Sequence, residues 1–100
     1  MYLSKMTTAQ AKEAFAKDPI LVIPVGSTEQ HGTQGALGTD FMVPSYLGDH
    51  IADMENVIVA PAVPYGVCPY HLSFAGSINI GYEGLYLVLH GITESLMGQG

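Results

Sequence analysis

Apolar residues follow a helical spacing near the start of the chain. Residues 7–17 open with a capping-box pattern, in which Thr7 accepts from a first-turn amide and Gln10 reaches back, and an apolar stripe follows. Because the residue before Pro19 disfavours helical backbone, this helix is expected to end near Lys17.

Two further helices are predicted from apolar residues that share one helix face. In residues 41–54 these are Tyr46, Leu47, Ile51 and Met54. Pro44, in the same segment, is tolerable only in the first turn of a helix. Near the end of the chain the apolar face consists of Leu85, Leu89, Ile92 and Leu96. Gly98 and Gly100 are placed to end this last helix.

Two aliphatic runs predict buried strands. Residues 20–25 and 57–60 are nearly unbroken apolar stretches rich in β-branched residues, as in strands that a parallel sheet covers on both faces. Residues 61–77 mix prolines, glycines and aromatic residues, which predicts an irregular loop of the kind that often carries function. A short strand is expected over residues 77–80.

The order of these elements predicts an α/β fold with a mostly parallel sheet flanked by helices. A helix that closes such a unit normally leads the chain to another parallel strand. We therefore expect residues 1–100 to be the amino-terminal portion of a single α/β domain, with the carboxyl-terminal part of the fold absent from this chain.

The composition indicates that part of the apolar surface of this chain is buried against another polypeptide. Hydrophobic residues make up 48% of it and charged residues only 12%. A domain of this size buries only about two-thirds of the surface that its unfolded chain exposes. We therefore expect a partner, either further copies or a carboxyl-terminal complement of the same fold.

Charge and cysteine usage exclude several classes of protein. The formal net charge is −6, and no lysine or arginine follows Lys17, so the chain lacks the cationic surface that nucleic acids require. The single cysteine, Cys68, excludes an internal disulfide and suits a reducing compartment. The residues after Lys5 are too polar for a signal peptide, and no apolar run approaches the roughly 20 residues of a membrane span. We expect a cytoplasmic protein with no membrane partner.

Candidate chemistry gathers in the stretch EQHGTQGALGTD, residues 29–40. Glu29 and His31 are two apart, so in an extended segment both side chains project to the same side, and a glycine-punctuated turn could bring Asp40 back to them. Carboxylate and imidazole groups suit Zn²⁺, Mn²⁺ or Fe²⁺. In the alternative interpretation the glycines are only turn residues and Asp40 merely caps the next helix. A phosphate loop is excluded, because the stretch lacks a Gly-Lys-Ser/Thr ending.

Three motifs resemble the creatininase (creatinine amidohydrolase) family. A strand ending in Pro-Val-Gly-Ser at residues 24–27 is followed by Glu-Gln-His-Gly, and an aspartate stands nine residues after the histidine, at Asp40. The segments PYG, residues 64–66, and HLSFAGS, residues 71–77, also match the family pattern. The resemblance covers most of residues 19–97.

The resemblance implies a binuclear metal amidohydrolase that acts on non-peptide, often cyclic, C–N bonds of small molecules, and that forms a homo-oligomer. By position, Glu29 would bind one metal ion, His31 the other, and Asp40 would bridge both. Zn²⁺ is the first choice for these two divalent ions, before Mn²⁺ or Fe²⁺. A hydroxide shared by the two ions would attack the substrate carbonyl. His71 is the candidate catalytic residue, as proton donor, with a structural role as the alternative.

Departures from the family pattern bear on the substrate. Gln34 stands where the family usually has a histidine, and neighbouring prolines are replaced, so creatinine itself is not the expected substrate. Two other classes stay open, a non-catalytic binding subunit of a hetero-assembly and a metal-dependent isomerase or lyase that acts on a sugar-like molecule.

Overall fold

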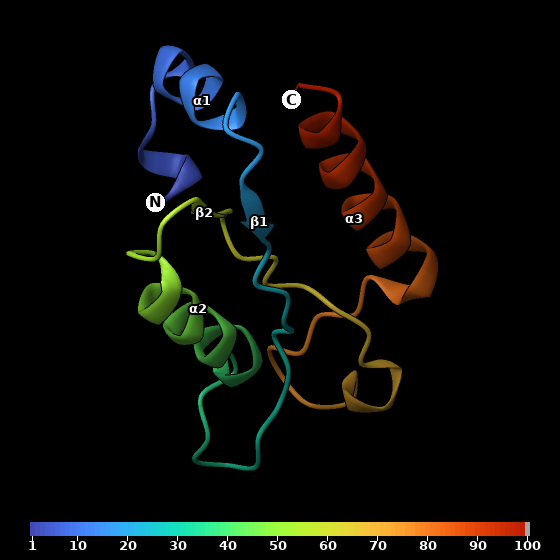
Figure 1. Cartoon of the computed structure of the whole chain (residues 1–100). Helices are drawn as coiled ribbons and strands as arrows, with labels where there is room; N and C mark the ends of the chain where they lie inside the picture. The colour runs from blue at the N-terminus through green and yellow to red at the C-terminus, as the bar shows by residue number, and fades with distance from the viewer. Residues whose placement is uncertain (100) are drawn as a thin grey trace.

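The computed structural model describes residues 1–99, so Gly100, one of the two glycines expected to end the last helix, lies outside the described residues. In the described residues three α-helices and two strands follow the predicted order, and two short 3₁₀ helices accompany them (Figure 1). Their bounds are, in chain order, the short 3₁₀ helix η1 (Leu3–Lys5), α1 (Thr8–Phe15), β1 (Ile20–Val22), α2 (Thr39–Ile51), β2 (Val57–Val59), the 3₁₀ turn η2 (Pro69–His71) and α3 (Gly81–Met97).

β1 and β2 pair in parallel, with Ile20, Leu21 and Val22 opposite Val57, Ile58 and Val59. The other side of β2 meets the start of the chain, because Tyr2 pairs with Val59. β2 is therefore the central strand, and the prediction of a fully buried strand there is confirmed.

The expectation for residues 20–25 is wrong in two respects. Regular pairing ends at Val22, because Pro24 has no amide hydrogen to donate, and pairing returns only as a bridge between Val25 and Val63. The strand is also not covered on both faces, since Ile20 is 65% exposed at the open end of the sheet. Residues 77–80 form isolated bridges rather than the expected strand.

α1 begins as predicted. The Thr7 hydroxyl accepts the Gln10 amide, and the Gln10 side chain accepts the Thr7 amide, which completes the capping box. The helix ends at Phe15, two residues before the expected position. Asp18, at a φ of 51°, turns the chain into β1.

α2 starts two residues earlier than the pattern of residues 41–54 predicts. The amides of Phe41 and Met42 both donate to the Gly38 carbonyl, and Gly38 is the residue that caps the helix. Pro44 therefore lies inside the helix rather than in its first turn. The Asp40 carbonyl, which would otherwise accept the amide of residue 44, has no such partner, and it faces Gly26 instead.

α3 confirms the predicted apolar face. Its half-buried side chains are Leu85, Leu89, Ile92 and Leu96, and Gly98 caps its end. Other apolar residues of the helix are open to solvent, since Tyr82 is 80% exposed and Leu87 is 60% exposed. Among residues 1–99, no helix is long and apolar enough to cross a membrane.

Candidate metal site

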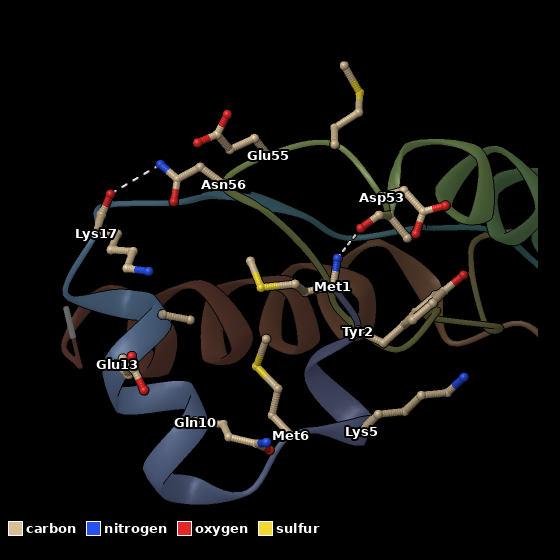
Figure 2. Close-up of a pocket in the computed structure, with 13 residues that line it drawn as sticks. Met1, Tyr2, Lys5, Met6, Gln10, Glu13, Lys17, Asp53, Glu55 and Asn56 are labelled. Atoms are coloured by element: carbon tan, nitrogen blue, oxygen red, sulfur yellow. Dashed lines mark hydrogen bonds between the residues drawn. The ribbon is translucent and has the colours of Figure 1, made fainter.

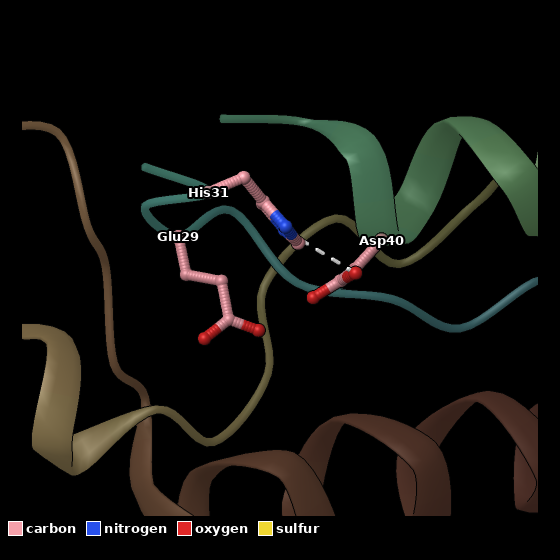
Figure 3. Close-up of side chains that lie close together, drawn as sticks. All are labelled: Glu29, His31 and Asp40. Carbon is pink, nitrogen blue, oxygen red and sulfur yellow. Dashed lines mark ion pairs between the residues drawn. The ribbon is translucent and has the colours of Figure 1, made fainter. Parts of the chain in front are cut away.

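The structure brings together Glu29, His31 and Asp40, the three side chains singled out as metal ligands (Figure 3). One ligand atom of each lies within 4.8 Å of the others. Glu29 and His31 come from the loop that follows β1, and Asp40 comes from the first turn of α2. The cluster thus lies beyond the carboxyl end of a strand, where open α/β sheets bind their ligands.

A tight turn places Glu29 and His31. The Glu29 amide donates to the Leu37 carbonyl at 2.9 Å, and the Gly35 amide donates to the His31 carbonyl at 3.2 Å. A Cβ on Gly35 would lie 2.6 Å from the His31 Cβ, so only glycine fits there. Gly32, at a φ of 71°, makes the left-handed step of the same turn. The glycines are indeed turn residues, and the turn that they make forms part of the site.

Asp40 is placed by a close approach between the β1 loop and α2. A Cβ on Gly26 would run into the Asp40 carbonyl oxygen and lie 2.5 Å from the Phe41 Cα. The missing side chain therefore lets the start of the helix approach the loop. The alternative that Asp40 merely caps α2 is wrong, because Gly38 is the capping residue and Asp40 is the second residue of the helix.

The imidazole of His31 has an unused nitrogen. Its Nε2 atom is buried and lacks a hydrogen-bond partner among the described residues, although Asp40 Oδ1 lies 3.3 Å away. That contact has an ion pair's distance but not a hydrogen bond's direction. A buried polar atom without a partner costs free energy, and a metal ion is one group that would remove this cost.

Electrostatics at Glu29 also favour a cation. The pKa of its carboxyl is raised above the ordinary value, first because it shares a hydrogen bond with Asp40 and next because it is buried. The nearby His71 opposes that shift. Two carboxyl groups held this close favour either a shared proton or a positive ion between them.

His71, the predicted catalytic residue, lies on η2 beside the cluster rather than in it. Its Nε2 atom is 3.3 Å from Glu29 Oε2, and its Nδ1 atom is 2.7 Å from the side-chain nitrogen of Gln30. The sequence analysis missed Gln30. The available signal was its place between two candidate ligands.

Two cavities in the described chain lie away from this cluster. The first, about 1120 Å³, is bounded by the N-terminal segment, α1 and the turn after α2, as Figure 2 shows. The second, about 480 Å³, includes Gly38, Phe41, Met42 and Ser45, which share the face of α2 turned away from Asp40. Neither cavity includes Glu29, His31 or Asp40 in its lining.

Known proteins resemble this chain over nearly its whole length. A family model described as creatinine amidohydrolase matches residues 4–100. The mycofactocin precursor peptide peptidase of Mycobacterium tuberculosis is 34% identical over 97 residues, which cover 87% of this chain and 39% of that protein. The 3-dehydro-scyllo-inosose hydrolase of Thermotoga maritima is 32% identical over 91 residues, which cover 88% of this chain and 29% of that protein.

Solved structures of creatininases have the same backbone fold as this chain. Creatininase with Mn and a mutant creatininase of Zn-Zn type each match with a TM-score of 0.90 at 23% sequence identity. These matches cover 99% of this chain and 41% of theirs. They confirm the predicted fold. The chain thus spans about two-fifths of the length of these structures.

Proposed function

Because this chain belongs to the creatininase (creatinine amidohydrolase) family, we propose that it forms part of a metal-dependent hydrolase and supplies ligands to two divalent metal ions. The convergence of Glu29, His31 and Asp40 carries this proposal. In the division that the family pattern suggests, Glu29 would hold one ion, His31 would hold the other, and Asp40 would contribute to both.

The donor set fits such ions. Imidazole nitrogen and carboxylate oxygen are ligands of Zn²⁺, Mn²⁺ and Fe²⁺, and Zn²⁺ is our first choice. The unpartnered Nε2 of His31 and the raised pKa of Glu29 are both relieved by a cation at this point. Three side chains cannot complete two coordination spheres, however. We therefore propose that a carboxyl-terminal complement of the same fold supplies the remaining ligands, with residues 1–100 as the amino-terminal portion of one domain.

The chain's own residues prepare the site for hydrolysis. When bound, divalent ions polarise a carbonyl group and make a water molecule more acidic. Asp40 is held at the start of α2, where the helix dipole favours its negative charge. His71 presents Nε2 at the edge of the cluster, a position from which a proton on that nitrogen can pass to the leaving nitrogen.

We propose an amide C–N bond as the bond that is cleaved. The family resemblance implies a non-peptide, often cyclic, amide, and the similarity to a protein named as a peptide peptidase extends that class to peptides. A sugar-like substrate is the second candidate, because another relative is named as a hydrolase of 3-dehydro-scyllo-inosose. That name favours hydrolysis over the isomerase or lyase alternative.

The assembly and its compartment complete the proposal. The exposed apolar residues of α3 need cover, and further copies of the chain in a homo-oligomer would supply it. The buried Cys68 has its thiol hydrogen-bonded to the Ile78 carbonyl and is free of disulfides, which suits the cytoplasm.

Replacing the bridging carboxylate tests the proposed metal site directly. Asp40→Ala in the full-length protein should abolish metal-dependent hydrolysis and lower the bound Zn²⁺, because two cations would be left to repel each other. Metal content is measured by elemental analysis, and hydrolysis by a product mass that has gained one water. Asp53→Ala, at the exposed turn after the other end of α2, is the matched control. Unchanged metal content and activity in Asp40→Ala would refute the assignment.

A further inference from the structure

The side chain of Gln30 links the metal cluster to the loop that carries His71. Its Oε1 atom accepts the Gly32 amide at 2.8 Å, and its Nε2 atom lies 2.7 Å from His71 Nδ1. On the far side of the ring, His71 Nε2 lies 3.3 Å from Glu29 Oε2. A continuous line of polar contacts therefore runs from a backbone amide to a proposed metal ligand.

The direction of every hydrogen bond in this line follows from its first member. A backbone amide can only donate, so the Gly32 contact identifies the side-chain oxygen of Gln30 and leaves its NH₂ group facing the ring. The NH₂ group also only donates, so His71 Nδ1 must accept. In a neutral imidazole one nitrogen accepts and the other carries the proton, which places the proton on Nε2, toward Glu29.

Several further hydrogen bonds hold the loop around Gln30 against the loop that follows His71. The contact between Gln30 and His71 therefore does not depend on one bond. The Gln30 amide donates to the Ser77 hydroxyl at 3.0 Å, and the Ile78 amide donates to the Thr28 carbonyl at 2.9 Å. The His71 amide in turn donates to the Cys68 carbonyl at 3.1 Å. The backbone on both sides of the Gln30–His71 contact is thereby fixed.

We infer that Gln30 is a positioning residue, which selects the Nε2-protonated form of His71 and so directs a hydrogen-bond donor at Glu29 Oε2. The carboxylate is then oriented by His71 through one oxygen, while Oε1 is left for a cation. Groups that hydrogen-bond to metal ligands orient them and commonly change metal affinity by about 10–100-fold when removed. Only this last step, toward the metal, rests on the proposed function.

The position of the ring proton can be measured without metal or substrate. In metal-free, full-length protein labelled with ¹⁵N-histidine, long-range ¹H–¹⁵N correlations of the neutral ring distinguish the two tautomers. The His71 signals are identified by their loss in His71→Asn. We expect Nε2 to carry the proton and Nδ1 to be bare. A neutral ring protonated at Nδ1 in the wild-type protein overturns the inference, whatever the enzyme's activity.

Gln30→Glu tests the role of the NH₂ group with almost no change of shape. The new carboxylate still accepts the Gly32 amide but cannot donate to Nδ1, so we expect His71 to place a proton on Nδ1 instead. Gln34→Glu makes the same change at an exposed position of the same loop and should leave the tautomer as in the wild type. An unchanged Nε2-protonated ring in Gln30→Glu would overturn the inference.

Metal binding provides the second readout. In Gln30→Leu, calorimetric titration with Zn²⁺ should show affinity about 10-fold weaker than in the wild type, and Gln34→Leu should show no loss. Equal affinity in Gln30→Leu and the wild type would overturn the step from Gln30 to the metal. If Gln30→Leu does not fold, the same comparison is made with Gln30→Glu. If the wild-type protein shows the Nε2-protonated ring of His71 but no hydrolysis, the result counts against the proposed function and not against the role of Gln30.

Discussion

β1 and β2 have nearly the same composition, Ile-Leu-Val and Val-Ile-Val, yet they lie in different surroundings. Ile58 in β2 is fully buried, at 0% exposure, whereas Ile20 in β1 is 65% exposed. β2 lies between β1 and the N-terminal segment, while β1 has no strand on its outer edge in the described part of the chain. Aliphatic residues therefore decide that a strand forms, and its neighbours decide how deeply it is buried.

The difference in burial between the two strands also distinguishes the region that stabilises the fold from the region that carries the candidate site. Much of the core of the described chain lies in and around β2, where Ala52, Val57 and Val59 form one packed cluster and Ile58 is fully buried. The more open β1 runs directly into the loop that carries Glu29 and His31 of the candidate metal site. Parallel sheets concentrate their ligands at the carboxyl ends of strands, and in this chain that end belongs to the less covered strand.

A matched pair of truncations tests this comparison most strongly. Ile58→Ala should lower the free energy of unfolding of the full-length protein by about 2–5 kcal/mol, because it leaves a cavity in the core. Ile20→Ala removes the same atoms at an exposed position, so its effect should stay within about 0.5 kcal/mol. Urea unfolding measures both. Equal losses would mean that β1 is as well covered as β2 in the complete protein.

The next largest effect on stability is expected at Gly26, where the loop after β1 contacts the start of α2. In Gly26→Ala the new methyl group would meet the backbone of Asp40 and Phe41, which are held in α2 and cannot move aside cheaply. We expect a loss of about 1–3 kcal/mol, with weaker Zn²⁺ binding because Asp40 is displaced.

Gly91→Ala is the control for this substitution. A Cβ at Gly91 would have no atom within 4 Å, and the position lies inside α3, so alanine should stabilise the protein by about 0.5–1 kcal/mol. Thermal unfolding and Zn²⁺ titration of both variants distinguish the close approach at Gly26 from a general preference for alanine. Full Zn²⁺ affinity in Gly26→Ala would show that Asp40 is not placed by this contact.

The sequence predicted what depends on residues close along the chain. The apolar face of α3, the capping box of α1 and the three side chains of residues 29–40 all follow from short spacings. Part of the candidate metal site could be predicted for this reason, since a turn of few residues, closed at Gly35, places Glu29 and His31.

What the sequence did not reveal depends on contacts between distant segments. The early start of α2, with Pro44 inside it, accompanies the approach of Asp40 to Gly26, and spacing alone does not indicate such an approach. Gln30 meets His71 from 41 positions away, so its place between two candidate ligands did not reveal which residue it contacts. The exposure of Ile20 likewise depends on which strands lie beside β1.

A smaller effect is the loss of folding stability that ionised Glu29 causes in the metal-free protein. The pKa of Glu29 is raised in the folded state, through its hydrogen bond to Asp40 and its burial. Below its ordinary pKa this carboxyl is protonated in both states. As pH rises through the raised pKa, the folded protein must ionise a buried group beside Asp40 and loses stability relative to the unfolded chain. The Glu29→Gln variant does not ionise there, so its stability relative to the wild type should increase from pH 4 to pH 7.

Thermal unfolding of metal-free, full-length protein across this pH range checks the direction. Glu13→Gln, on the exposed side of α1, controls for the loss of one charge. Added Zn²⁺ should reverse the order at pH 7, because a ligand that binds only the folded state stabilises it, and Glu29→Gln has lost one donor. The wild type should then gain more stability from Zn²⁺ than the variant does. A wild-type advantage that grows with pH in the absence of metal would show that Glu29 stabilises the open region on its own, against the contrast drawn between β1 and β2.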